Sequence, residues 1–151
     1  MAQQHDQKNR KTRTLAVHAG EAPDPVTRAS APNIVMSSTF VLDEPVGFSA
    51  YDIPEEAPFI YSRWRNPTVK QLEDKMAVLE EASACRCFAS GMAATAAVLL
   101  NHLSKGDHLV ISNTNYPGTA EFARDTLTRF GIEVTPVDSS ELANIRNAIQ
   151  T

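Results

Sequence analysis

Residues 84–112 read ACRCFASGMAATAAVLLNHLSKGDHLVIS, and this stretch decides the fold class. A short apolar run ends at Ser90 and Gly91, a small-residue segment of helical length follows, and a second apolar run closes the stretch. The pattern predicts a strand over 84–89, a helix over 93–103 and a second strand over 108–112. Strands joined by a helix form a β-α-β unit with a right-handed crossover, so the stretch predicts an α/β fold.

Helical and strand patterns continue on both sides of this stretch. Upstream, apolar residues recur at helical spacing at Val69, Leu72, Met76 and Leu79. They predict a helix over residues 68–82 that begins in a capping box at Thr68. Downstream, the sequence predicts a helix over 120–130 closed by Gly131, a strand over 132–137 and one more helix. The alternation of strands and helices indicates a parallel sheet.

The first sixty residues differ in character from the rest. Six prolines interrupt them, at Pro23, Pro25, Pro32, Pro45, Pro54 and Pro58. Only residues 34–42 predict a strand there, so we expect residues 1–60 to form an arm that packs on another surface. Residues 61–151 then form an incomplete α/β domain, because a parallel sheet needs cover on both faces and usually more than three strands. The sequence therefore predicts part of a longer chain.

Charge and hydropathy exclude several classes of partner. The formal net charge of -4 argues against a nucleic-acid binder. A short basic run, Lys8, Arg10, Lys11 and Arg13, lies in a polar tail, and no apolar segment follows it as in a signal peptide. The longest apolar stretch, residues 93–100, is too short to span a bilayer. We expect a cytoplasmic protein with neither a membrane nor a nucleic acid as partner.

The two cysteines of the chain, Cys85 and Cys87, are separated by Arg86. On a strand both thiols would point to the same face, and no His or further Cys lies nearby to complete a metal site. The favoured interpretation is a pair of buried thiols that pack as small apolar side chains. A redox pair or a zinc site is the alternative.

The turn at Ser90, Gly91 and Met92 is the first candidate binding site. Free backbone N–H groups at a helix N-terminus bind anions, and the helix dipole favours negative charge there. Gly91 lets a phosphate approach the backbone closely, and Ser90 can cap the helix or donate to an oxygen. A plain strand-to-helix turn explains the same residues equally well. Neither a P-loop nor a Gly-x-Gly-x-x-Gly motif is present, which disfavours a nucleotide-binding domain.

Two further segments carry polar and aromatic groups suited to a flat, phosphorylated ligand. Tyr61 and Arg63 flank one small residue, and a guanidinium can hold phosphate oxygens bidentately. Tyr116 follows the predicted strand 108–112, at the sheet edge where ligands of open α/β folds bind. Its ring could stack on a heterocycle and its phenol could move a proton. Alternatively, the first segment only leads into a helix, and Tyr116 packs on a Pro-Gly turn.

In this order and at these separations, the segments resemble the cystathionine γ-synthase (trans-sulfuration) family of pyridoxal-phosphate (PLP) enzymes. The segments are YSRWRNPT at 61–68, SGMAA at 90–94, and Tyr116 in a Tyr-x-Gly-Thr setting. LAVHAG at 15–20 and SSTF at 37–40 are similar to that family's N-terminal segment. The resemblance extends over residues 14–138, and although each motif alone is weak, the set is specific.

The resemblance implies a role for each matched residue in binding PLP. The backbone N–H groups of Gly91 and Met92, next to Ser90, would bind the cofactor phosphate. Tyr61 and Arg63 would reach the same phosphate from a neighbouring subunit. Tyr116 would stack on the pyridine ring and assist proton transfer, which makes it the catalytic candidate. No metal is implied.

The resemblance also implies a fold and an activity. The fold is the aspartate-aminotransferase-like α/β type (PLP fold type I), assembled as dimers paired into tetramers, with the arm crossing between subunits. The activity is γ- (or β-) elimination or replacement on small amino acids that bear sulfur or an acylated homoserine oxygen. Members include cystathionine γ-synthase, cystathionine and methionine lyases, and homoserine sulfhydrylases.

The lysine inventory departs from the family pattern. PLP chemistry needs a lysine that forms a Schiff base with the cofactor. The chain offers Lys8, Lys11, Lys70, Lys75 and Lys105, and none stands in the family's lysine motif. Asp138 is expected to cap a helix rather than to pair with the pyridinium nitrogen. We therefore expect the 151 residues alone to be inactive; the alternative function is that of an oligomerisation partner without catalysis.

Overall fold

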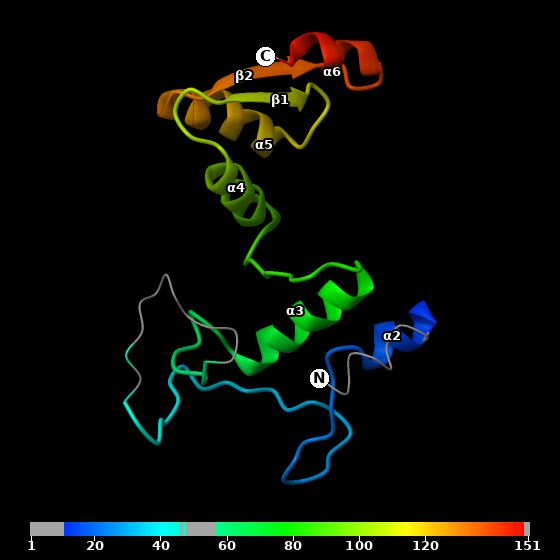
Figure 1. Cartoon of the computed structure of the whole chain (residues 1–151), viewed down its shortest axis with the longest axis vertical. Coiled ribbons are helices and arrows are strands. Elements are labelled where there is room, and N and C mark those ends of the chain that lie inside the picture. Colours follow the sequence, from blue (N-terminus) through cyan, green and yellow to red (C-terminus); the bar gives the residue numbers. More distant parts are fainter. Residues whose placement is uncertain (1–10, 46, 48–56, 150–151) are drawn as a thin grey trace. The chain divides into compact units, whose positions relative to one another are not determined.

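The computed structural model describes residues 11–45, 47 and 57–149, and the chain divides into two compact units, residues 1–87 and 88–151 (Figure 1). The first unit contains the helices α2 (Thr12–His18) and α3 (Pro67–Leu79). The second contains, in order, α4 (Gly91–His102), β1 (His108–Ser112), α5 (Pro117–Glu121), a π-helix (Phe122–Leu127), a 3₁₀ turn (Thr128–Phe130), β2 (Glu133–Val137) and α6 (Leu142–Ala148). The predicted division into an intersubunit arm and a domain concerns packing on a second subunit, and it stays a prediction.

In the first unit, α2 packs on α3 through a glycine (Figure 1). Gly20 has a φ of 70°, and a Cβ there would lie 2.8 Å from the carbonyl oxygen of Gln71 and 2.9 Å from the backbone nitrogen of Lys75. Only glycine fits so close an approach in this conformation. Lys75 strengthens the same junction, because its ammonium donates to the carbonyl of Val17 and pairs with Glu21. The sequence patterns did not predict α2.

The start of α3 corrects the predicted capping box. The N-cap is Asn66, whose side-chain oxygen accepts from the backbone nitrogen of Thr68 at 2.9 Å. Pro67 takes the first helical position, where its missing N–H costs nothing. The Thr68 hydroxyl instead accepts from the backbone nitrogen of Val35 at 2.9 Å. The capping box at Thr68 is therefore wrong, although the helix it was meant to start is present and ends at Leu79.

Two predicted strands do not form. Residues 34–42 contribute only an isolated antiparallel bridge between Thr39 and Tyr61. Residues 84–88 have no regular structure, because no strand in the described part of the chain offers them a ladder of hydrogen bonds. An extended segment with apolar residues becomes a strand only beside a partner, which a local pattern does not show.

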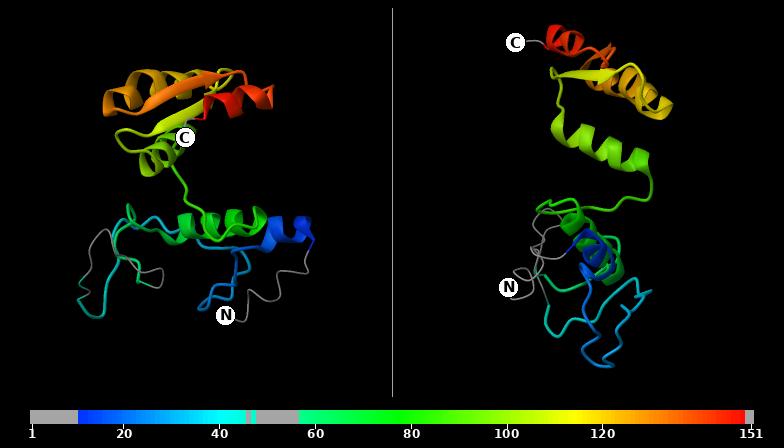
Figure 2. Two further views of the ribbon diagram at one scale, coloured as in Figure 1. Left: turned by 45° about the horizontal axis from the view of Figure 1, so that its top comes forward. Right: turned by 90° about the vertical axis from the view of Figure 1, so that its right-hand side faces the viewer.

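The second unit is built on a parallel pair of strands, as predicted. β1 and β2 pair in register from His108 opposite Glu133 to Ser112 opposite Val137. Figure 2 shows the helix formed by α5, the π-helix and the 3₁₀ turn lying along this pair. That helix ends at Gly131, which adopts the left-handed conformation predicted for it, with a φ of 78°.

The core of the second unit is small. Its fully buried members are Ala123, Leu127 and Ile132. Partly buried apolar side chains surround them: Leu99, Leu103, Leu109, Ile111, Phe122 and Val134. They come from α4, both strands and the π-helix, so this cluster fixes the ends of β1 and α4 relative to each other. Among the described residues, no helix combines the length and the apolar character needed to cross a bilayer.

Candidate functional site

The N-terminus of α4 presents free backbone donors. Ser90 is the N-cap, and its hydroxyl accepts from the backbone nitrogen of Ala93 at 3.1 Å. This bond satisfies the third N–H of the helix and leaves the first two, those of Gly91 and Met92, without an acceptor among the described residues. A Cβ placed on Gly91 would meet no atom within 4 Å. An anion can therefore reach both N–H groups without a clash.

Tyr116 lies beside this helix N-terminus, because the Tyr116 ring and the Met92 side chain both lie close to Gly118. A Cβ on Gly118 would lie 2.7 Å from Cε1 of the Tyr116 ring and 3.3 Å from Sδ of Met92. The hydroxyl of Thr119 donates to the same sulfur at 3.6 Å. The start of α5 thus packs on the start of α4 only because residue 118 has no side chain. The Tyr116 ring remains 67% exposed, so one face is available to a ligand.

Tyr61 and Arg63 form a second group, within the first unit. The Arg63 guanidinium lies 5.0 Å from the centre of the Tyr61 ring, in the range of a cation–π contact. The Trp64 ring packs edge-on against the Tyr61 ring, with the ring centroids 5.7 Å apart. The side chain of Arg63 is exposed, and among the described residues no carboxylate or carbonyl accepts from it. Its five donors are open to an anionic ligand.

Ser62 and Asn66 hold the loop between these two residues. The Ser62 hydroxyl donates to the carbonyl of Ser37 at 2.5 Å, and its backbone nitrogen donates to the carbonyl of Ser38 at 2.8 Å. The Asn66 amide donates to the Ser62 hydroxyl at 2.8 Å and to the carbonyl of Val35 at 3.1 Å. Asn66 is a buried polar residue, and the loop geometry depends on its side chain.

Arg65 differs from Arg63 although only one residue separates them. Its guanidinium donates to the carbonyl of Ala57 at 3.2 Å and lies 5.3 Å from the centre of the Phe59 ring. Its side chain is half-buried, whereas that of Arg63 is exposed. Arg65 is therefore engaged with the protein itself.

Asn115 was not predicted as a site residue. Its amide donates to the carbonyl of Ser112 at the end of β1, and its side-chain oxygen is buried without a partner among the described residues. It lines a pocket of about 240 Å³ between the C-terminal end of β1 and the helix that starts at α5. An asparagine three residues after a strand and next to Tyr116 is the sequence signal that could have identified it.

Three of the four described lysines are placed for structure, and the fourth, Lys11, is the exposed N-cap residue of α2. Lys70 pairs with Asp74 on α3, and Lys75 pairs with Glu21. Lys105 follows α4 and packs over Gly131. A helix of 12 residues is about 18 Å long, so Lys105 lies at the far end of α4 from Gly91. Lys8 lies outside the described residues.

Asp138 does not cap a helix, contrary to expectation. The N-cap of α6 is Glu141. Asp138 instead accepts from the hydroxyl of Ser140 at 2.6 Å and from its backbone nitrogen at 3.0 Å. These hydrogen bonds lower the pKa of the Asp138 carboxyl, with the hydroxyl making the larger contribution. The turn stabilises the residues between β2 and α6.

The structure thus brings Ser90, Gly91, Met92 and Tyr116 together in one unit and holds Tyr61 and Arg63 on one loop of the other. Open N–H groups at a helix start, with an exposed ring at the C-terminal end of a parallel strand, define an α/β site for a flat anionic ligand. Residues 13–151 match the model of the Cys/Met metabolism PLP-dependent enzymes. The chain belongs to this family, whose members depend on PLP.

Individual relatives agree with the family and with the fold. The chain is 40% identical over 137 residues to L-methionine γ-lyase of Fusobacterium nucleatum, covering 91% of this chain and 34% of the relative. It is 40% identical over 136 residues to cystathionine γ-synthase of Mycobacterium bovis, covering 90% and 33%. The crystal structure of metB from Corynebacterium glutamicum superimposes with a TM-score of 0.83 at 33% identity, covering 96% of this chain and 36% of that one.

These comparisons confirm the PLP fold type I predicted from the sequence. They also show that the chain spans about a third of the length of the relatives it matches.

Proposed function

We propose that the chain supplies the phosphate-binding part of a PLP-dependent trans-sulfuration enzyme. The reaction is γ- (or β-) elimination or replacement on small amino acids that carry sulfur or an acylated homoserine oxygen. The observation that carries the proposal is the contact between the α4 N-terminus and the α5 start, which places the exposed Tyr116 ring beside two free N–H groups. This juxtaposition suits a cofactor that is both aromatic and phosphorylated.

The residues present fit PLP. The N–H groups of Gly91 and Met92 would hold phosphate oxygens, and the open space at Gly91 leaves room for the ester. Ser90 would keep these donors in place through its bond to Ala93. Bound PLP supplies the electron sink for negative charge at the substrate α-carbon.

Tyr116 has two roles in the proposal. Its ring would stack on the cofactor and fix the plane of the pyridine, because one face of the ring is exposed. The close contact between the ring and Gly118 holds the ring in place. Its phenolic oxygen would hold or move a proton near the substrate. Both roles need the ring in its present position, which a larger residue at 118 would prevent.

Tyr61 and Arg63 would bind the same phosphate from a neighbouring subunit in a dimer of dimers. Their support is the exposed guanidinium, fixed over the Tyr61 ring, on a loop held by Asn66. A homotetramer and a cytoplasmic location both stay predictions. The choice between a lyase and a synthase also stays open, because relatives of both names are equally similar to this chain.

The experiment that tests the proposed activity uses the intact protein that carries this chain, loaded with PLP. It is incubated separately with L-methionine, L-cystathionine and O-succinyl-homoserine, the last with and without L-cysteine. We expect turnover of at least one compound, with 2-oxo acid and ammonia from elimination and a new thioether from replacement. A folded, PLP-loaded protein that turns over none of them would contradict the proposal.

The matched variant in this experiment is Tyr116→Phe, which keeps the ring and removes only the phenolic oxygen. We expect kcat to fall by about 10²–10⁴, the range of general acid–base catalysis, with PLP affinity unchanged. Loss of PLP affinity with kcat intact would instead assign Tyr116 to cofactor binding alone.

The second candidate is an oligomerisation partner without catalysis. It rests on the described lysines, of which Lys70 and Lys75 are ion-paired and Lys105 lies at the far end of α4. The 151-residue chain added to a full-length relative distinguishes the two. Association without turnover by the chain itself supports the second candidate for this chain, and turnover by the isolated chain contradicts it.

A further inference from the structure

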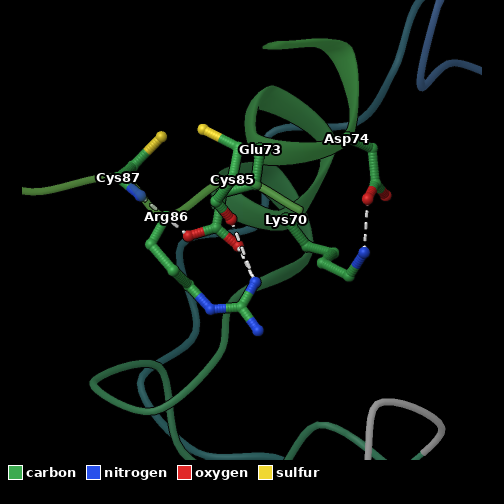
Figure 3. A network of polar contacts seen from close by, with 6 residues as sticks. All are labelled: Lys70, Glu73, Asp74, Cys85, Arg86 and Cys87. Carbon is green, nitrogen blue, oxygen red and sulfur yellow. Dashed lines mark hydrogen bonds and ion pairs between the residues drawn. The ribbon is translucent and has the colours of Figure 1, made fainter. Parts of the chain in front are cut away.

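Cys85 and Cys87 lie on one extended segment with their thiols close together (Figure 3). Both are free and half-buried. Both thiols point to the same side of the segment (Figure 3), and the Cys85 thiol is close enough to raise the pKa of the Cys87 thiol. Neither residue belongs to the candidate PLP site.

Glu73 on α3 fixes this segment from the side. One of its carboxylate oxygens accepts from the backbone nitrogen of Cys87 at 3.0 Å, and the other pairs with the Arg86 guanidinium at 3.4 Å. The same guanidinium donates to the carbonyl of Cys85 at 3.0 Å. The carboxylate and the guanidinium therefore turn to one side of the backbone and leave the two thiols on the other (Figure 3).

The backbone geometry permits a bridge between the two residues. Two residues of extended chain span at most about 7 Å, and a disulfide needs Cα atoms about 4.4–6.8 Å apart. A small bend therefore suffices, and residues 84–88 can bend because they belong to no helix or strand. A bridge near the upper distance limit is readily reduced again, which is typical of labile rather than structural disulfides.

We propose that Cys85 and Cys87 form a redox-active dithiol that closes to an intramolecular disulfide by exchange with a low-molecular-weight disulfide such as oxidised glutathione. The Cys85 thiolate attacks one sulfur of the oxidant, forms a mixed disulfide and releases the first molecule of reduced thiol. Cys87 then attacks the Cys85 sulfur and releases the second. Two protein thiols are oxidised, one small disulfide is reduced to two thiols, and the two protons pass to those thiols.

The surroundings give the two cysteines different parts in this exchange. Burial raises the pKa of the Cys87 thiol, and the charges of Cys85 and Glu73 raise it further. Cys87 is therefore kept as a thiol, so we assign the first attack to Cys85. Conversion of Cys85 to a mixed disulfide removes its charge from the pair, which lowers the cost of ionising Cys87 for the second step.

The zinc alternative is not favoured by the structure. In the described part of the chain, no group of three or more His, Cys, Asp or Glu side chains is placed to hold a metal ion. Two thiols without further ligands do not complete a tetrahedral zinc site.

The test is the reaction of the folded, intact protein with oxidised glutathione, followed by peptide mass mapping without reduction. The wild type should yield a peptide with Cys85 and Cys87 joined, two hydrogens lighter and without retained glutathione. Cys87→Ser should instead retain one glutathione on Cys85, because no second thiol displaces it. Cys85→Ser should react more slowly, because burial and the charge of Glu73 still raise the pKa of the remaining Cys87 thiol. An excess of reduced glutathione should restore the wild-type dithiol.

Two results would overturn the inference. One is a wild type that carries a separate glutathione on each cysteine, which would show that the thiols react independently. The other is a folded wild type that does not react while the urea-unfolded protein does, which would show that both thiols are inert in the native state. None of these readouts depends on PLP or on turnover, so they test this inference independently of the proposed function.

Discussion

Replacement of Arg63 by Ala is expected to weaken PLP binding by about 10–100-fold in the intact protein. A hydrogen bond to a charged group contributes about 1.5–3 kcal/mol, and each 1.4 kcal/mol corresponds to a factor of ten in affinity. The expectation follows from the exposed guanidinium, held over the Tyr61 ring and free of acceptors among the described residues. Equilibrium dialysis of PLP against both proteins measures it.

Arg65→Ala is the matched control for this substitution. The two arginines are two positions apart, but Arg65 donates to Ala57 and packs over Phe59. Its loss should leave PLP affinity within a few-fold and lower the thermal midpoint instead. Equal loss of PLP affinity in both variants would show that binding depends on the positive charge of the segment and not on Arg63 in particular. Unchanged affinity in Arg63→Ala would remove the assignment of Arg63 to the phosphate.

Replacement of Leu127 by Ala is expected to cost about 2–5 kcal/mol of unfolding free energy, the range for truncating a fully buried leucine. Leu127 is 0% exposed and sits between Ala123 and Ile132 in the core that joins α4 to the strands. Urea denaturation of the intact protein, followed by near-UV circular dichroism, measures the change.

Leu142→Ala is the control, because Leu142 is 73% exposed on α6. An exposed site should change the free energy by no more than about 0.5 kcal/mol. A similar effect of both substitutions would mean that the core is not centred on Leu127. A larger effect at Leu142 would show that another part of the protein covers α6.

The regular part of the second unit could be predicted from the sequence. The strand over 108–112 is found with the predicted bounds, the apolar helix before it is present, and Gly131 ends the helix before β2. In these segments the local preference and the tertiary contacts agree. The apolar residues that predict each element also form the face that packs on Leu127 and its neighbours.

The elements that were wrong or missed depend on contacts that a local pattern does not contain. Among the described residues, the segment 84–88 has no neighbouring strand, and α2 is held by the close approach of Gly20 to α3. Asn66 is the N-cap of α3 because Pro67 is well suited to the first helical position, so the residue before it becomes the cap. In each case a residue distant in sequence, or the fixed φ of a proline, decides between two locally acceptable states.

The candidate site shows the same limit. The residue types of Ser90, Gly91, Met92 and Tyr116 indicated a ligand with a phosphate and a ring, but each had an equally simple structural explanation. Only the structure shows that Gly118 lets Tyr116 and Met92 pack together. The sequence assigned no role in the site to Asn115 or Asn66, because a buried amide is recognised by its partners, which the sequence does not reveal.

We expect the N-terminus of α4 to bind the PLP phosphate as a dianion, and phosphorus NMR of the PLP-loaded intact protein tests this expectation directly. A free phosphate ester takes up a proton near its second pKa of about 6, and its resonance shifts accordingly. Donation by the N–H groups of Gly91 and Met92 should lower that pKa, because hydrogen bonds to the charged form favour it. The bound resonance should stay at the dianion position from about pH 7.5 down to about pH 5.5, on either side of that pKa. A bound resonance that titrates like free PLP would contradict it.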